Sequence, residues 1–556
     1  MHFLYLYKRL NKLYLLTALS FFMVACGDSS PENSISFEED GAPAYGSVYV
    51  TGAIGEPSNL VPFLAGDSAS SAVTSHIYTT LIKYDKDLNL APELAKSWQV
   101  SDDGLTITFN LRQDITWQDG KPFTAEDVMA TYKVITAPDT RTPYAEKYTI
   151  VQKAHAPDPF TFKVTYDKPF APALSSWTQL SILPAHVLKD VDDIHTASLV
   201  TDPVGTGAYK LHNWKRGQEI QLMENPDHFE GRPYITLQRQ RIITDQDAQF
   251  LALRKGEIDS MGLKPIQYER LTSGEDFTRR YEKYRYMGRS YVYMGFNLNH
   301  PLFKRRDVRQ ALSYATPRST IIQGILMGHG VASFGPFMPN TWAEHPDLAP
   351  YPHNPEKAKE ILKEAGWADS NGNGILDKNG KEFSFTVVTN QGNDQRIKTA
   401  EILQQAFKQI GIEMNIRVQE WATFLENTIH QRNFDAVILG WTLPVEPDPY
   451  DVWHSSKTGA REFNFVGFKN PEADQLIKKA RATFDKQERQ KALWRFQEIL
   501  HREQPYLFLY TPYSLIAVHK RFKNIEPAPA GISYNFKDWY VPAEQQIYNV
   551  NTLIQQ

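Results

Sequence analysis

The segment 383–441 alternates runs of β-forming residues with helical patterns, and this order constrains the fold more than any other feature. Residues 383–389 have the pattern of a strand, and apolar residues recur at helical spacing over 394–410. Polar and apolar residues then alternate over 412–418, and a short helix precedes the last strand-like run, 434–441. Strand, helix, strand, helix, strand predicts a mostly parallel sheet with both faces covered, and hence an α/β fold.

Length and composition set the broad class. The chain has 556 residues, too many for one hydrophobic core, so two or three domains are expected. Hydrophobic residues make up 42% and charged residues 22%, as in soluble globular proteins. The formal net charge of −4 argues against a nucleic-acid partner, which would require a basic face. Because Cys26 is the single cysteine, an intramolecular disulfide cannot form.

The N-terminus has the pattern of a signal peptide. Lys8, Arg9 and Lys12 precede an apolar run of about 13 residues, which is too short to span a bilayer and ends at Cys26. The string VAC-GDSS around Cys26 resembles a bacterial lipobox, which implies that this cysteine is lipidated and begins the mature protein. A conventional signal peptide beside an unrelated cysteine is the alternative. The segment 26–45, acidic and rich in Ser, Pro and Gly, predicts a flexible tether.

Local signals in the first half predict further elements. Polar and apolar residues alternate over 106–111, behind a hairpin turn at 102–104, which predicts a half-buried strand. Thr124 and Asp127 have the spacing of a capping box that starts a helix.

Six longer stretches resemble a known family. They are 91–132, 202–211 (DPVGTGAYKL), 221–233 (QLMENPDHFEGRP), 295–315, 366–381 and 464–480. In this order they resemble the solute-binding proteins of ABC importers in the oligopeptide and dipeptide group, called family 5 or cluster C. The resemblance covers essentially everything from about residue 46 to the C-terminus.

The resemblance implies a two-lobed α/β fold, the periplasmic binding protein type II (cluster C) fold. It also implies an extra subdomain in the first lobe and a two-segment hinge. The expected segments are 1–25 (signal peptide), 26–45 (lipid-anchored tether), 46–79, 199–294 and 520–556 (first lobe), 80–198 (extra subdomain) and 295–519 (second lobe). Proteins of this kind close two lobes on a ligand, and the closed form is what a membrane partner recognises.

The stretch 434–450 (FDAVILGWTLPVEPDPY) holds the main candidate for a binding site, because a strand breaks there into a stiff loop. Pro444, Pro447 and Pro449 can neither stay in a sheet nor form a helix. A polypeptide can bind along a strand edge, and Gly440 lets another backbone come close. An ordinary strand with its exit loop is the alternative interpretation.

The resemblance implies two ligand-pairing segments. In the best-known members of the family, the end of this strand pairs with ligand backbone from the second lobe, and a loop of the first lobe pairs from the other side. The matching candidate residues are Gly440, Trp441, Thr442, Gly66, Asp67 and Ser68.

One position departs from the family pattern. Peptide binders of the family carry an aspartate three residues after the tryptophan, which pairs with the α-amino group of the ligand, and here that position is Pro444. Asp448 is the first candidate for an amine contact and Glu446 the second. Solvated loop carboxylates without this role are the alternative. The departure leaves open whether the ligand is a peptide.

The string DSNGNGILD at 369–377 is similar to a calcium loop, with oxygens at Asp369, Asn371, Asn373 and Asp377. The glutamate that closes an EF-hand is absent, so a turn between a helix and a hairpin is the alternative. The 15 histidines show no HExxH or other paired spacing, so no dedicated metal site is expected.

Other charged and glycine-rich motifs indicate no chemistry. Arg305, Arg306 and Arg309 are expected on the solvated face of a helix start rather than in a ligand site. No GxSxG elbow or complete phosphate fingerprint is present, so neither a catalytic residue nor a cofactor is expected.

These patterns predict a lipid-anchored, monomeric binding protein in the periplasm or on the cell surface, which is not an enzyme. Its expected partners are an oligopeptide ligand, the ABC permease and ATPase subunits, and the membrane through the N-terminal lipid. The alternatives are a non-peptide ligand in the same fold (an oligosaccharide, an opine-like compound or a metal chelate), an exported hydrolase, and an envelope interaction protein that senses rather than transports.

Overall fold

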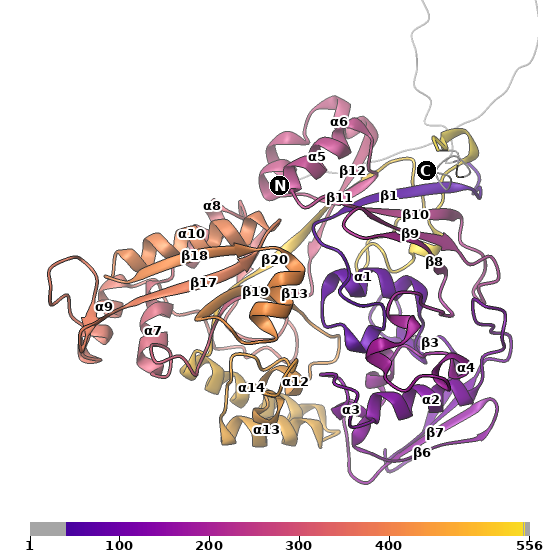
Figure 1. The fold of residues 1–556 in the computed structure, drawn as a ribbon, viewed down its shortest axis with the longest axis horizontal. Coiled ribbons are helices and arrows are strands. Elements are labelled where there is room, and N and C mark those ends of the chain that lie inside the picture. The colour runs from indigo at the N-terminus through magenta and orange to yellow at the C-terminus, as the bar shows by residue number, and fades with distance from the viewer. Residues whose placement is uncertain (1–40, 549, 551–556) are drawn as a thin grey trace, which may run out of the picture. The chain divides into compact units, whose positions relative to one another are not determined.

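The computed structural model describes residues 41–548 and 550 (Figure 1). The expected signal peptide, Cys26 and most of the expected tether lie outside this part, so the lipobox stays a prediction. Among the described helices, none combines the length and the apolar character that crossing a membrane requires.

A twelve-stranded sheet runs through the described part of the chain. Its path is β18-β17-β19-β13-β20-β11-β1-β10-β9-β8, and β12 and β14 also pair with β20. The strands of the first lobe are β1 (Ser47–Ala53), β8 (Tyr209–Lys215), β9 (Glu219–Glu224), β10 (Ile235–Ile242), β11 (Ser260–Gly262) and β12 (Tyr281–Met287). Those of the second lobe are β13 (Ser290–Phe296), β14 (Gly330–Ala332), β17 (Ser384–Asn390), β18 (Glu413–Gln419) and β19 (Ala436–Thr442).

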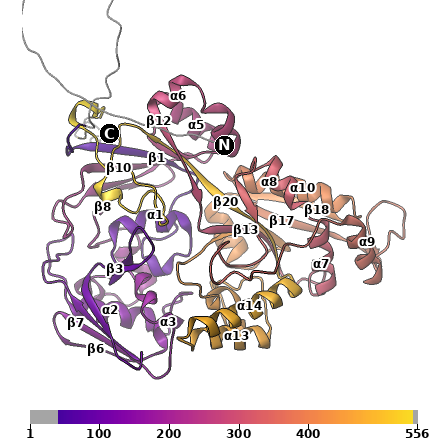
Figure 2. The ribbon, with the colours of Figure 1, turned by 180° about the vertical axis from the view of Figure 1, so that it is seen from behind.

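Strand β20 (Tyr506–His519) belongs to both lobes, and Figure 2 shows it in yellow between them. Its first residues pair with β13 and β14, and from Tyr513 onward it pairs with β12 and then β11. The other connection is the short link between Met287 and Ser290. Two adjacent strand segments therefore join the lobes, a few residues before the boundaries expected at 295 and 520, which stay predictions.

The first lobe packs helices on both faces of its sheet. Val48 and Val50 point into one core with α5 (Gln246–Lys255) and α6 (Glu275–Arg280), whereas Tyr49 points to the opposite face. There it meets the C-terminal return of the chain and α1 (Ser68–Ile77). This alternation along β1 is what a strand buried on both sides requires.

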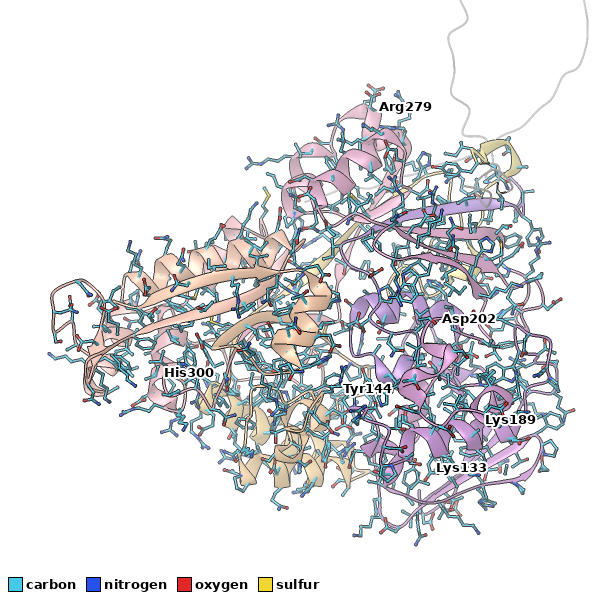
Figure 3. All side chains as sticks on the ribbon, viewed as in Figure 1. Lys133, Tyr144, Lys189, Asp202, Arg279 and His300 are labelled. Atoms are coloured by element: carbon cyan, nitrogen blue, oxygen red, sulfur yellow. The ribbon has the colours of Figure 1, made fainter. Side chains whose placement is uncertain are left out.

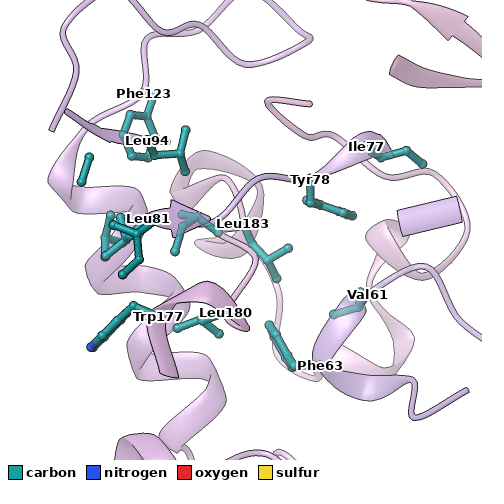
Figure 4. Packing of buried hydrophobic residues seen from close by; sticks show 14 of the residues in the cluster. Val61, Phe63, Ile77, Tyr78, Leu81, Leu94, Phe123, Trp177, Leu180 and Leu183 are labelled. Atoms are coloured by element: carbon teal, nitrogen blue, oxygen red, sulfur yellow. The ribbon is translucent and has the colours of Figure 1, made fainter. Parts of the chain in front are cut away.

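A separate four-stranded sheet lies in the expected extra subdomain, in the order β4-β5-β7-β6. The bounds are β4 (Ala95–Val100), β5 (Thr106–Leu111), β6 (Val151–Asp158) and β7 (Thr161–Tyr166), with β2 (Ile82–Tyr84) and β3 (Leu90–Pro92) paired beside it. Its helices are α2 (Ala125–Thr136), α3 (Glu146–Thr149) and α4 (Ala185–Leu188). The predicted capping box is confirmed, because Thr124 and Asp127 cap α2 reciprocally. Figure 4 shows Trp177 and Leu183 of this region in one core with Ile77 of α1.

In the second lobe, the predicted parallel order is confirmed for β17, which pairs in parallel with both β18 and β19. The expectation of a mostly parallel sheet was wrong, because β13 pairs antiparallel with β19 and β20, and β14 pairs antiparallel with β20. The helices of this lobe are α7 (Arg306–Ala315), α8 (Arg318–Gly324), α9 (Pro355–Glu364), α10 (Asp394–Lys408), α11 (Trp421–Thr423), α12 (Tyr450–Trp453), α13 (Pro471–Arg481) and α14 (Lys486–Glu503). Val387 shares a core with Leu403 of α10, and the next residue, Val388, shares another with Phe496 of α14. Both faces of the sheet are thus covered.

A second expectation for this lobe was also wrong. Arg305 and Arg306 are exposed as expected, but Arg309 is 5% exposed. Its guanidinium donates to the carbonyl oxygens of Glu503 (2.6 Å), Phe303 (2.6 Å) and Gln504 (3.2 Å). Charged helix-start residues usually face water, but here the end of α14 offers buried carbonyls that need a donor.

Candidate functional site

Strand β19 has an edge without a strand partner. All seven of its residues pair with β13, from Ala436 opposite Phe296 to Thr442 opposite Ser290. On its other side, β17 pairs with Ala436 and Val437 alone, so within the described chain no strand covers that edge from Ile438 to Thr442. Unpaired strand edges present N–H and C=O groups that can take up another chain.

Gly440 lies where β19 passes a buried guanidinium. A Cβ atom at this position would lie 2.9 Å from Arg396 Nη2 and 3.0 Å from the carbonyl oxygen of Tyr291, closer than side-chain atoms pack. Arg396 Nη1 donates to Asn390 Oδ1 (2.8 Å), its Nε has no hydrogen-bond partner, and no described carboxylate forms an ion pair with it. Burial lowers the pKa of Arg396. A cation in this position is suited to an anionic or carbonyl group of a ligand.

In the first lobe, the predicted segment Gly66 to Ser68 begins α1. Asp67 caps the helix: its Oδ1 accepts from the Ser70 N–H (2.9 Å), and its Oδ2 accepts from the hydroxyls of Ser58 (2.6 Å) and Ser70 (2.7 Å). The Asp67 carboxylate is therefore committed to the protein. Gly66 and Ser68 are exposed and can offer backbone groups.

Phe463 links the two predicted segments. Its ring centroid lies 5.1 Å from that of Trp441 and 5.4 Å from that of Tyr144, a first-lobe residue that Figure 3 labels at the side facing the second lobe. A Cβ atom on Gly66 would lie 2.7 Å from Phe463, so the glycine permits this close approach. The structure thus brings together the end of β19 and the first-lobe loop, which the sequence resemblance identified only as two separate segments.

The two carboxylates predicted to contact a ligand amine are both paired with arginines. Asp448 Oδ2 accepts from Arg481 Nε (3.1 Å), and the side chains are 5% and 8% exposed. Glu446 forms an ion pair with Arg489. A carboxylate already neutralised by a guanidinium is a poor partner for a ligand amine. The amine contacts at Asp448 and Glu446 remain predictions, and Pro444 is exposed in the same loop.

Arg481 also binds the first lobe. Its Nη1 lies 2.5 Å from Glu146 Oε2 on α3, and beside it Lys147 Nζ lies 2.8 Å from Asp451 Oδ2 on α12. Burial alone would lower the pKa of Arg481, but the carboxylates of Asp448, Glu146 and Asp451 raise it above the ordinary value. These two ion pairs therefore hold the lobes together at this side of the site.

A cavity of about 290 Å³ lies beside the end of β19. Trp441, Thr442 and the loop through Pro449 form one wall, and Leu88 of the first lobe contributes to another. The remaining lining includes Arg289, Tyr291, Phe337, Met338, Trp342 and Trp453. A mostly apolar cavity with few polar groups is typical of ligand sites.

The calcium-loop candidate forms a turn between α9 and the hairpin of β15 (Asp377–Lys378) and β16 (Lys381–Glu382). Asp369 accepts hydrogen bonds from the N–H groups of Gly372, Asn373 and Gly374, and Asp377 accepts from Ser370. Asn371 and Asn373 accept from backbone N–H groups two residues further on. Within the described residues, no three His, Cys, Asp or Glu side chains are placed to hold a metal ion.

The sequence patterns missed four residues at this site: Arg289, Arg396, Phe463 and Arg481. A signal existed for Arg396, because it lies in the first turn of a helix after a parallel strand, where ligands of α/β sheets bind. The other three have no local signal, since their roles depend on residues distant in the sequence.

Comparison with known proteins decides the family. A model for "Bacterial extracellular solute-binding proteins, family 5 Middle" matches residues 89–463. The chain is a family 5 solute-binding protein. This solute-binding protein is 34% identical to the oligopeptide-binding protein AppA of Bacillus subtilis over 543 residues, which cover 96% of this chain and 98% of the relative. The predicted family is therefore confirmed.

Solved structures confirm the predicted two-lobed fold. AppA of Bacillus subtilis in complex with a nonapeptide matches with a TM-score of 0.86 and 32% identity, covering 90% of this chain and 100% of that one. The protein DppA of Helicobacter pylori, in complex with the peptide STSA, matches with a TM-score of 0.80 and 27% identity, covering 90% and 99%. NikZ of Campylobacter jejuni, in complex with Ni(L-His), matches with a TM-score of 0.81 and 25% identity, and the match covers 89% of this chain and 99% of that one. AppA and DppA are binding proteins rather than enzymes.

Proposed function

We propose that this protein is the extracytoplasmic substrate-binding lipoprotein of an ABC importer, and that it captures oligopeptides between its lobes and delivers them to a permease. The observation that carries the proposal is the unpaired edge of β19 next to a cavity that residues of both lobes line. A peptide can pair with such an edge whatever its side chains are. AppA, whose relationship spans nearly the whole chain, is an oligopeptide-binding protein.

Gly440, Trp441 and Thr442 are the proposed pairing residues of the second lobe. The backbone of Gly66 and Ser68 faces the same region from the first lobe, linked through Phe463. In this proposal, the Asp67 side chain acts by fixing the start of α1 rather than by touching the ligand. Backbone pairing would let the protein capture peptides whatever their sequence. The side chains that line the cavity would discriminate between peptides.

Contacts between the lobes support capture by closure. The pairs Arg481–Glu146 and Lys147–Asp451 and the packing of Phe463 on Gly66 each join the two lobes. Such contacts lower the free energy of the closed form relative to the open form, and a bound peptide favours the closed form further. The proposed permease and ATPase would receive the closed form, with Cys26 holding the lipid anchor and the protein acting as a monomer.

Native mass spectrometry of the full-length protein, extracted in mild detergent without unfolding, tests the peptide assignment. Slow release from a closed site should keep the ligand bound during purification. We expect a series of adducts whose masses and fragments correspond to short peptides. A single non-peptide adduct would overturn the peptide assignment but not the binding role.

A non-peptide ligand is the second candidate. Pro444 replaces the aspartate that peptide binders of the family use for the ligand amine, and the similar NikZ was solved with Ni(L-His). Displacement of the adduct by added peptides, measured in the same spectrometer, separates the two candidates. Peptides that compete with the retained ligand support the first, and failure of every peptide to compete supports the second.

A further inference from the structure

Arg289 is a cation without a protein partner in the cavity beside β19. It is half-buried and lines the cavity, yet no described acceptor hydrogen bonds with its guanidinium and no described carboxylate lies within ion-pair distance. Burial lowers the pKa of Arg289, and Tyr84 is the one neighbour that opposes this shift. Partly buried guanidinium groups in folded proteins are normally accompanied by an anion, and that of Arg289 lacks one among the described residues.

The carboxylates around this cavity are already neutralised. Asp448 is the one acidic residue in the lining of the cavity, and Arg481 holds it at 3.1 Å. Glu446, in the same proline-rich loop, is paired with Arg489. Because each acid has its own arginine, Arg289 leaves the cavity with one uncompensated positive charge.

The backbone fixes Arg289 beside the end of β19, on the side of β13. Its carbonyl oxygen accepts from the Leu443 N–H (2.8 Å), and the next residue, Ser290, lies opposite Thr442 in the β13–β19 ladder. The link to the proposed pairing residues is the cavity itself, which Arg289 lines together with Trp441 and Thr442. Around it, Tyr291, Trp342 and Trp441 offer flat apolar surfaces to the groups that precede the anion.

We propose that the Arg289 guanidinium binds a carboxylate of the captured peptide, in a subsite whose aromatic walls hold the adjoining apolar part. The planar guanidinium can donate two parallel hydrogen bonds to a carboxylate, which a lysine cannot do. The carboxylate is either the C-terminal group of the peptide or an Asp or Glu side chain. This inference rests on the proposed function, because it specifies which peptides the site prefers.

Matched synthetic peptides distinguish these sources. A pool of peptides of several lengths is prepared, each as the free acid and as the C-terminal amide. Each of these forms is made once with an internal Asp and once with the isosteric Asn. Full-length protein is incubated with the pool, and native mass spectrometry measures what it retains. We expect a preference of about 10- to 100-fold for one carboxylate form over its neutral twin. A preference for free acids identifies the C-terminus, and a preference for Asp over Asn identifies a side chain.

Arg289→Gln should abolish that preference by weakening the retention of the carboxylate forms to the level of their neutral twins, and Arg289→Lys should retain part of it. Arg285→Gln is the control, because Arg285 lies on Tyr513 (4.2 Å to the ring centroid) and does not line the cavity. Equal thermal unfolding of all variants shows that they are folded. Wild-type protein that binds peptides without any carboxylate preference, or Arg289→Gln that keeps the preference, overturns this inference and leaves peptide capture standing. Wild-type protein that binds no peptide overturns both.

Discussion

Removing the cation of Arg481 should weaken ligand retention strongly, because this residue joins carboxylates of both lobes. Arg481 contacts Asp448 within its own lobe and Glu146 across the gap, and Asp451 lies near enough to raise its pKa further. Burial raises the pKa of Glu146 in spite of Arg481. The arginine, rather than the glutamate, is therefore the partner whose loss costs more, and Arg481→Met is the informative change.

The magnitude follows from the burial of these groups. The side chain of Arg481 is 8% exposed and that of Asp448 is 5% exposed, whereas Glu146 is 23% exposed. Breaking a buried pair by removing one partner costs about 3 to 5 kcal/mol. Glu146 stays partly hydrated in the closed form, and the carboxylates become more hydrated when the lobes separate. We therefore expect Arg481→Met to destabilise the closed form relative to the open form by about 2 to 4 kcal/mol. This corresponds to a loss of affinity of roughly 30- to 1,000-fold.

Stopped-flow measurement of tryptophan fluorescence provides the assay, with the peptide that native mass spectrometry identifies. Dissociation should accelerate by most of that factor, whereas association should change little, since the ion pair forms after the ligand enters. Arg495→Met is the matched control: Arg495 contacts Glu472 and Glu498 but is 45% exposed, so its loss should cost about 0 to 1 kcal/mol. Unchanged dissociation in a folded Arg481→Met protein, or an equal loss in the control, would refute the reasoning.

Three further predictions concern individual residues. Gly440→Val should weaken peptide binding measured by calorimetry, because its Cβ would meet Arg396 and the Tyr291 carbonyl oxygen and so displace the end of β19; unaltered affinity would contradict this. Arg309→Met should lower the free energy of unfolding in urea by about 3 to 5 kcal/mol, since buried carbonyls lose their donor, and a change below about 1 kcal/mol would count against that role. Burial lowers the pKa of His228 to about 4, so stability should be complete above about pH 6.5 and fall as the pH drops toward 4. His228→Gln should flatten this decline, which urea titrations across that range would detect.

Local patterns predicted the elements of this protein well because their causes are local. The alternation over 383–441 predicted the parallel order of β17, β18 and β19, and the spacing of Thr124 and Asp127 predicted the start of α2. Periodicity and capping depend on residues within a few positions of one another. The resemblance supplied the two-lobed arrangement, which periodicity alone does not contain.

The roles of the charged residues could not be predicted in the same way. Arg309 followed the pattern of an exposed helix start, but the carbonyls at the end of α14 lie nearly two hundred positions away, with a separation of 194. Arg481 and Glu146 are 335 positions apart, so nothing near Asp448 indicated that its charge is already neutralised. Only the folded structure shows which acidic residue forms an ion pair with which arginine.

This pairing bears directly on what the departure at Pro444 means. An aspartate there would favour a ligand amine, but here the proline-rich loop offers Asp448 and Glu446, and each already contacts an arginine. Among the described residues that line this cavity, Arg289 is the one charged side chain without an ion-pair partner. If the ligand is a peptide, the electrostatics of this cavity favour recognition of a carboxylate rather than of the amino terminus. The site would then orient its ligand differently from other peptide binders of the family. Proline in place of aspartate at position 444 and the cation of Arg289 would be two parts of this one change.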